Sequence, residues 1–171
     1  MCIRTLSAVT LLVVAVSAVL AGQPQEREVI APIVDEKYGS AEEIMALRPE
    51  RLVGILKDQE ASVFARAKAC QRLAVTAKAS AVPALEALLP DPEVSHYARF
   101  ALEAIPDPSV DEALRRALGK VEGKLLVGVI NSLGRRKDVR ALPALAGLLH
   151  SEDSEVAQAA AAAMSRIRPA F

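Results

Sequence analysis

The residues best suited to chemistry lie around His96 and at Cys70. His96 stands between two copies of Pro-Asp-Pro, at residues 90–92 and 106–108. A histidine held in this way could shuttle protons or bind a metal ion, but either role needs a carboxylate or a second ligand at a suitable spacing. The only other histidine is His150, and neither histidine has such a partner in the sequence. We therefore interpret His96 as a solvated surface residue and predict no metal site.

Cys70 is the second candidate for chemistry. A cysteine nucleophile needs a base within reach and a lowered pKa, and no sequence feature points to either. Cys70 follows Ala69, which we assign below to the core, and a free cysteine is commonly a small buried apolar residue. We expect Cys70 to be buried, and we predict no catalytic residue and no cofactor.

Charge is segregated along the chain although its sum is zero, with 21 bases and 21 acids among 171 residues. From Arg115 to Arg140 eight bases stand against two acids, whereas residues 22–60 contain nine acids and five bases. A surface of one sign attracts a partner of the opposite sign. We therefore predict a partner-binding basic surface that consists of Arg115, Arg116, Lys120, Lys124, Arg135, Arg136, Lys137 and Arg140.

These residues belong to a repeat of about thirty residues. The apolar positions Leu73, Leu102, Leu133 and Met164 are 29, 31 and 31 residues apart, and apolar residues also stand four and eight positions before each. A second series, Leu85, Leu114 and Leu145, has the spacings 29 and 31. Spacings of four and eight place residues on one helical face, so each repeat is predicted to contain two amphipathic helices. Such pairs bury their apolar faces by stacking, which predicts an all-α fold.

Helix-capping residues fit this division. In Asp91-Pro92 and in Asp107-Pro108 a carboxylate precedes a proline. This order suits a helix N-cap followed by the first helical position. Asp138 and Ser80 are predicted to begin the other second helices. The two Pro-Asp-Pro motifs are therefore interpreted as helix starts, with no role in a reactive site.

The repeats resemble the HEAT repeat family, in the short variety known from phycobilisome lyases. The resemblance rests on Val-x3-Ala-x3-Leu at residues 94–102, and on Val-Pro-Ala-Leu at 82–85 and Leu-Pro-Ala-Leu at 142–145. It implies a right-handed α-solenoid of about three and a half helix pairs whose second helices line a concave face. The lyases attach chromophores, but a shared scaffold does not transfer their catalytic residues.

The N-terminal segment differs from the rest. Arg4 precedes an uncharged run from Leu6 to Leu20, and Val19 and Ala21 supply an aliphatic and a small residue at the −3 and −1 positions of a cleavage site. This pattern is typical of a secretory signal peptide. The run is shorter than the roughly 20 residues that span a bilayer. We predict a cleaved signal peptide at residues 1–21 and an exported protein, periplasmic or secreted. The alternative is a membrane anchor through an uncleaved N-terminal segment.

The predicted organisation after the signal peptide has three parts. Residues 22–39 lack periodicity and are predicted to form a tether. Residues 40–60 form an N-terminal helical segment, a degenerate half-repeat that begins with the capping box Ser40-Ala41-Glu42-Glu43. Residues 61–171 form the HEAT-like repeat domain, whose last unit stops after its first helix.

The main functional hypothesis is an exported, non-catalytic protein–protein interaction scaffold. Its expected partner is another protein with an acidic segment, and 3% aromatic residues leave few rings on which nucleic-acid bases could stack. We expect no nucleic-acid binding and no stable membrane insertion after cleavage. One alternative is an accessory or lyase-like scaffold that uses Cys70. Another is one module of a larger assembly, completed by another chain on the terminal helix, through which the chain could also self-associate.

Overall fold

The computed structural model describes residues 33–167, and residues 1–32 and 168–171 lie outside this part. The predicted signal peptide and most of the predicted tether therefore fall outside the described residues. Within 33–167 the chain is helical apart from one short hairpin, which confirms the all-α prediction. None of the helices in this range combines the length and the apolar character needed to cross a membrane.

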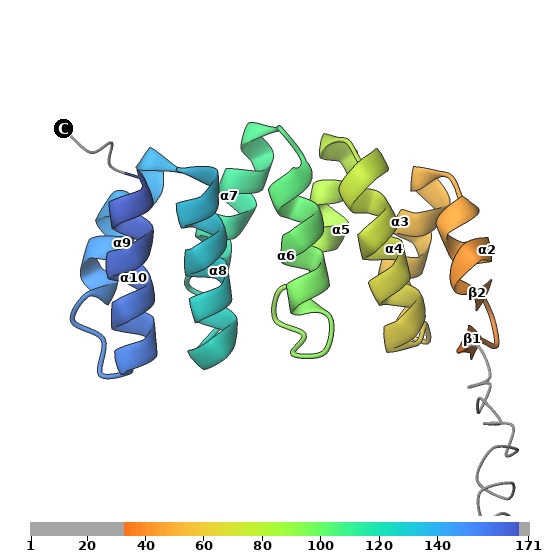
Figure 1. Ribbon diagram of the computed structural model, residues 1–171, viewed down its shortest axis with the longest axis horizontal. Coiled ribbons are helices and arrows are strands. Elements are labelled where there is room, and N and C mark those ends of the chain that lie inside the picture. The colour runs from red at the N-terminus through yellow and green to blue at the C-terminus, as the bar shows by residue number, and fades with distance from the viewer. Residues whose placement is uncertain (1–32, 168–171) are drawn as a thin grey trace, which may run out of the picture. The chain divides into compact units, whose positions relative to one another are not determined.

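Most of the described α-helices form two rows (Figure 1). The first row consists of α4 (Val63–Thr76), α6 (Ser95–Ala104), α8 (Gly123–Arg136) and α10 (Ser154–Ile167), each packed against the next. The second row consists of α3 (Pro49–Lys57), α5 (Val82–Glu86), α7 (Pro108–Ala117) and α9 (Leu142–Leu148). Short 3₁₀ turns, η1 (Ala79–Ala81) and η2 (Val139–Ala141), precede α5 and α9. Successive helices along the chain thus alternate between the rows.

The core lies between the two rows and contains the predicted apolar positions. Fully buried leucines recur in both series, namely Leu73, Leu102, Leu133, Leu85, Leu114 and Leu145. Met164 in α10 is only partly buried and packs at the edge of this core. Burying one leucine side chain contributes about 1.5–3 kcal/mol, so the repeated positions supply much of the stability.

Glycine permits the close approach of α8 and α10. A Cβ atom added at Gly134 would lie 2.8 Å from the Cα of Ala163. That distance is shorter than a carbon–carbon contact, so a larger residue would push the two helices apart. The small residues of α10 therefore pack closely on α8, as the alanine-rich sequence of this helix suggests.

Among the caps predicted within the repeats, those at Asp107 and Asp138 are confirmed, whereas those at Asp91 and Ser80 are wrong. Asp107 caps α7 by accepting a hydrogen bond from the Ser109 N–H at 2.9 Å, and Asp138 caps η2. Asp91 does not cap α6, which begins one turn later at Ser95. A turn over residues 92–94 intervenes and brings Val94 into the core with no exposed surface.

Asp91 and Ser80 have other positions than predicted. The Asp91 carboxylate accepts a hydrogen bond from the Glu93 N–H at 2.9 Å and pairs with Arg66, also at 2.9 Å. Ser80 lies inside η1, whose N-cap residue is Lys78. Burial of apolar neighbours therefore shifts the helix starts that capping preferences alone would select.

The predicted capping box at Ser40 and Glu43 is present and begins α2 (Ala41–Ala46). Just before it, β1 (Val34–Asp35) pairs with β2 (Gly39–Ser40) in an antiparallel hairpin. Asp35 is 8% exposed and accepts a hydrogen bond from the Ser62 hydroxyl. Residues 33–39 are therefore part of the folded body, and the tether prediction is wrong for these residues.

A second contact fastens the hairpin to the end of α3. The Tyr38 hydroxyl donates to the Asp58 carboxylate at 2.5 Å, and the Lys37 Nζ lies 2.7 Å from the same group. These hydrogen bonds, from Lys37 first and then from Tyr38, lower the pKa of Asp58 to about 2. The hairpin, α3 and α4 are thus joined by polar contacts between residues twenty or more positions apart.

Candidate partner-binding surface

The eight predicted basic residues occupy several places in the fold. Arg115 and Arg116 end α7, Lys120 follows in the next turn, Lys124 lies in the first turn of α8, Arg135 and Arg136 lie in its last turn, Lys137 is its C-cap and Arg140 lies in η2. Lys124 and Arg135 lie near opposite ends of α8, about 17 Å apart at a rise of about 1.5 Å per residue. Their roles divide according to what each side chain contacts.

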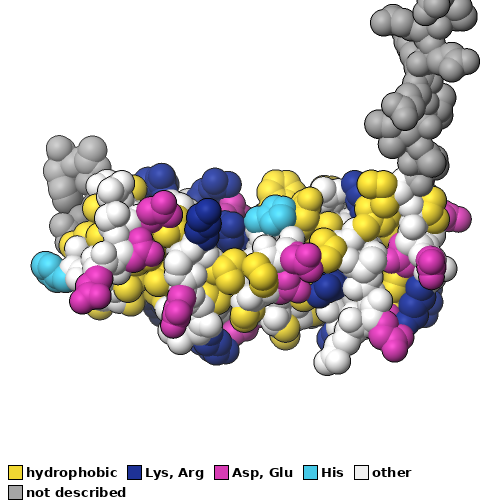
Figure 2. Space-filling view, turned by 90° about the horizontal axis from the view of Figure 1, so that it is seen from below, with side chains coloured by type: hydrophobic (Ala, Val, Ile, Leu, Met, Phe, Trp, Pro, Cys, Tyr) yellow, Lys and Arg dark blue, Asp and Glu magenta, His cyan; other side chains and the backbone are white. Residues whose placement is uncertain are grey.

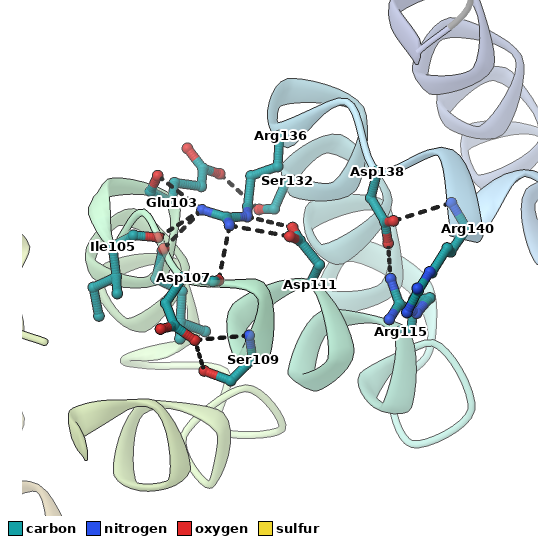
Figure 3. A network of polar contacts seen from close by, with 11 residues as sticks. Glu103, Ile105, Asp107, Ser109, Asp111, Arg115, Ser132, Arg136, Asp138 and Arg140 are labelled. Atoms are coloured by element: carbon teal, nitrogen blue, oxygen red, sulfur yellow. Dashed lines mark hydrogen bonds and ion pairs between the residues drawn. The ribbon is translucent and has the colours of Figure 1, made fainter. Parts of the chain in front are cut away.

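Arg136 is used inside the fold (Figure 3). Its guanidinium group holds the Asp111 carboxylate through Nε at 2.5 Å and through a second nitrogen at 3.2 Å. It also donates to backbone carbonyls at the end of α6 and in the following turn, including Ile105 at 2.9 Å and Asp107 at 3.2 Å. Arg136 therefore satisfies the carbonyl groups that a helix C-terminus leaves without partners, and it joins α6, α7 and α8.

Arg115 is also committed to an internal contact. It pairs with Asp138, whose side chain is 6% exposed and which also caps η2 (Figure 3). This pair connects α7 to the second-row turn that follows α8. A change of charge at Arg115 would leave the buried carboxylate of Asp138 without its partner.

Arg116 and Lys120 share one carboxylate. Arg116 binds Glu86 of α5 with two hydrogen bonds, at 3.0 and 2.7 Å, and the Lys120 ammonium group lies 3.7 Å from the same side chain. The hydrogen bonds from Arg116 are the main reason that the pKa of Glu86 is lowered. These two cations are therefore partly neutralised by the preceding second-row helix.

Arg135 pairs with Glu103 of α6 at 2.8 Å, although 70% of the Arg135 side chain is exposed. The second oxygen of Glu103 accepts a hydrogen bond from the buried Ser132 hydroxyl at 2.7 Å. Within residues 33–167, no carboxylate pairs with Lys124, Lys137 or Arg140. Five of the eight predicted cations thus have acidic partners. Three of these acidic residues, Glu86, Glu103 and Asp111, come before Arg115 in the sequence.

A groove on the first row gathers a different set of cations. It encloses about 610 Å³ across α6, α8 and α10 and is lined by Arg99, Lys124, Val127, Gly128, Asn131, Arg135 and Arg166. No carboxylate lines it in the described part of the chain. Arg99 and Arg166 lie outside the basic segment from residue 115 to residue 140, so a count of charge along the sequence misses them.

Arg99 enters this groove because residue 128 is glycine. Its guanidinium group donates to the Gly128 carbonyl at 3.2 Å, and an added Cβ at Gly128 would lie 2.6 Å from the Arg99 Cζ atom. The Arg99 Nε is buried and has no hydrogen-bond partner within residues 33–167. Burial lowers the pKa of Arg99, the nearby carboxylate of Glu103 opposes this, and the charge of Arg135 acts in the same direction as burial. Arg99 is thus a cation whose hydrogen-bonding capacity is incompletely used.

An adjoining hollow has a different character. About 400 Å³ across α4, α6 and α8 is lined by Gln71, His96, Tyr97, Arg99, Phe100, Glu103 and Arg135. The ring of His96 is exposed as predicted and lies beside Tyr97, with 3.8 Å between the ring centroids. Phe100 is 55% exposed and lies on the solvent side of α6. The two hollows share Arg99 and Arg135 and therefore adjoin each other at these side chains.

Cys70 is buried, as predicted, with no exposed surface. Burial raises the pKa of its thiol to about 12, and the nearby charge of Arg66 opposes this only in part. At neutral pH such a thiol remains protonated and is a poor nucleophile.

A comparison with protein-family models and with curated protein sequences finds no match for this chain.

Proposed function

We propose that this protein is an exported, non-catalytic interaction scaffold that binds an acidic segment of another protein. In this proposal the two helical rows are a right-handed α-solenoid of about three and a half HEAT-like helix pairs. The main support is the side-by-side packing of α4, α6, α8 and α10, which presents one face built from four segments of the chain (Figure 1). Repeat proteins of this kind bind through extended surfaces of neighbouring repeats.

The basic character of the partner-binding surface is argued from cations that lack carboxylate partners in the described residues. Lys124, Lys137 and Arg140 remain from the predicted set, and Arg99 and Arg166 join them from other helices. Arg115 and Arg136 are less suitable, because withdrawing them would leave Asp138 and Asp111 unpaired.

The experiment is capture of partners by the full chain, expressed with its own N-terminal segment. Proteins crosslinked to it in the exported fraction are identified by mass spectrometry, and capture is repeated in rising NaCl and with poly-glutamate as competitor. We expect one partner to be lost both at high salt, where screening acts over about 3 Å at 1 M, and with competitor. If the amount of captured partner does not change with salt or competitor, the proposal of an acidic partner is contradicted.

Export is tested on the same sample. The mass of the purified protein should correspond to loss of residues 1–21, with Gly22 as the first residue. An intact N-terminus in the membrane fraction would instead support the uncleaved anchor.

The alternative that uses Cys70 makes an opposite prediction about thiol chemistry. We expect Cys70 in the native protein to react with a thiol reagent at pH 8 only as fast as the protein unfolds, because the thiol is buried and its pKa is raised to about 12. Labelling in denaturant provides the control for full reactivity. Rapid labelling of the folded protein would favour the accessory or lyase-like role.

The alternative of a module within a larger assembly is supported by one observation. Leu149, which follows α9, is 38% exposed, whereas Leu89 at the corresponding position after α5 is 1% exposed. A further helix of another chain packed on this end would cover Leu149. Sedimentation of the full chain and of Leu149→Lys tests this, and an assembly lost in the variant would support it.

A further inference from the structure

We infer that the groove across α6, α8 and α10 is the binding site for an extended acidic peptide segment that carries an aromatic or large apolar residue at one end. This inference rests on the proposed scaffold function and specifies its site and its ligand. It places binding on the first-row face, whereas the sequence resemblance would place it on the second helices.

The first observation is the arrangement of cations along α8. Lys124 lies near the start of the helix, Arg99 reaches it at Gly128, Arg166 reaches it at Asn131 with 3.2 Å between the bonded atoms, and Arg135 lies near its end. Positions 124, 128, 131 and 135 are three or four residues apart, so about one cation stands at each helical turn. The groove therefore has a row of positive charge along its length.

The second observation is that these charges are largely uncompensated within residues 33–167. Arg99 and Arg166 bind neutral oxygen atoms, and no contact with a carboxylate is present for Lys124. Among the described residues, Arg135 alone of these four cations forms an ion pair, with Glu103, whose charge also acts on Arg99. A row of like charges is unfavourable unless an anion or solvent offsets it, and the buried, unpartnered Nε of Arg99 adds a donor that is not satisfied internally.

The length of the row selects the kind of anion. About 17 Å separates positions 124 and 135, which an extended chain covers with about five residues. Alternate side chains of such a segment point to the same side and are about 7 Å apart, so three of its carboxylates can each lie near a cation. A single phosphate or carboxylate ion is too small to contact all the cations of this row at once.

The adjoining hollow selects the residue at the end of the segment. Phe100 is 55% exposed and Tyr97 lines the same hollow, which meets the cationic groove at Arg99 and Arg135. Figure 2 shows Lys and Arg side chains gathered along one edge over the C-terminal half of the described body, with hydrophobic side chains beside them. An aromatic or large apolar side chain that follows the acidic stretch would cover Phe100.

The probe is a fluorescein-labelled peptide of three alternating Glu-Ala pairs followed by Phe, titrated with the full chain in fluorescence anisotropy. Competitors are the unlabelled Glu peptide itself, inorganic phosphate, the peptide with Lys in place of Glu, and the peptide with Ser in place of Phe. We expect the Glu peptide to compete, the Lys peptide not to compete, and phosphate to compete only at concentrations at least about a hundredfold higher. Phosphate that competes as well as the peptide would overturn the extended ligand.

Three charge-reversed pairs locate the site. In the groove, Lys124→Glu with Arg166→Glu should weaken binding about tenfold or more. On the second-row side, Lys137→Glu with Arg140→Glu should weaken it less than about threefold. Lys57→Glu with Lys78→Glu, which changes charge equally at the N-terminal end, is the matched control for net charge. Circular dichroism and the thermal midpoint of each variant report whether it folds.

The outcomes separate the two proposals. If the Lys137/Arg140 pair loses binding and the groove pair does not, the groove assignment is overturned while an acidic-segment scaffold stands. If all three pairs lose binding equally, the attraction is non-specific and both proposals are overturned. Phe100→Ser adds an independent measurement, because it should weaken the Phe peptide and leave the Ser peptide unchanged. If Phe100→Ser weakens binding of both peptides equally, Phe100 does not contact the aromatic residue of the ligand.

Discussion

Arg136 and Arg99 both extend from one first-row helix to its neighbour, yet the two guanidinium groups have opposite surroundings. Arg136 meets the Asp111 carboxylate and several carbonyl oxygens at the end of α6, and its side chain is 13% exposed. Arg99 meets the Gly128 carbonyl at 3.2 Å and the Ser132 hydroxyl at 3.5 Å, and its Nε has no partner in the described residues.

The difference shows how the same residue type can serve structure in one place and recognition in another. A cation whose donors are all used inside the fold stabilises it and is unavailable to a ligand. A cation that is held in place but incompletely paired costs some stability and can offer its charge to a partner. The surroundings of each arginine therefore indicate its role better than the density of positive charge along the chain.

The largest expected loss of stability follows from truncation of Leu102 in α6, the helix that both arginines contact. Leu102 is fully buried. The same helix contains Arg99, and carbonyl groups at its C-terminal end accept hydrogen bonds from Arg136. We expect Leu102→Ala to lower the free energy of unfolding by about 2–5 kcal/mol in urea denaturation, because it leaves a cavity between the rows. Phe100→Ala on the exposed side of the same helix is the control, and equal losses for both would contradict a core beneath α6.

The second effect is the loss of Arg136. We expect Arg136→Met to lower the free energy of unfolding by about 2–4 kcal/mol, because Asp111 and the carbonyls at the end of α6 would be left partly buried without a donor. Urea denaturation measures the loss, and a double-mutant cycle with Asp111→Ala isolates the pair itself. A loss below about 0.5 kcal/mol would place Arg136 among ordinary surface ion pairs.

The same substitution at Arg99 should have a much smaller effect. We expect Arg99→Met to change the free energy of unfolding by less than about 1 kcal/mol in either direction. The substitution removes a partly buried charge with an unsatisfied donor, and with it only the long hydrogen bonds to Gly128 and Ser132. Urea denaturation of this variant and of Arg136→Met under the same conditions measures the difference between the two sites. Equal losses at the two sites would mean that Arg99 also serves mainly to stabilise the fold.

The smallest expected effect concerns Asp58, another carboxylate whose partners are internal. Hydrogen bonds from Lys37 and Tyr38 lower its pKa to about 2, below the value of about 4 in an unfolded chain. A lowered pKa contributes stability that is fully present above about pH 4 and is lost as the pH falls through about 2.

This sign predicts the behaviour of Asp58→Asn. Between pH 5 and pH 2 the thermal midpoint of the unchanged protein should fall more than that of the variant, and above pH 5 the variant should be the less stable of the two. Glu36→Gln, a change at an exposed carboxylate in the same hairpin, is the control. Parallel pH profiles for all three proteins would show that the contacts of Asp58 add nothing to stability.

The periodic apolar residues by themselves determined that the described chain is helical and which residues are buried. Leu85, Leu114 and Leu145 recur at nearly constant spacing, and an amphipathic helix can bury such residues only on its apolar face. The caps at Ser40, Asp107 and Asp138 were also predictable, because a cap is satisfied by backbone groups two or three residues away. Burial of Cys70 followed from its neighbour in the same apolar pattern.

Which cations lack a carboxylate partner depends on contacts between distant parts of the chain. Arg136 finds Asp111, Arg116 finds Glu86 and Arg135 finds Glu103 across 25 to 32 positions of sequence, so a local count of charge could not foresee these pairs. The contribution of Arg99 and Arg166 to the groove and the folding of residues 33–39 onto α3 and α4 likewise depend on distant neighbours. Helix formation and capping are local along the chain, whereas the pairing of charges depends on which segments the packing of helices brings together.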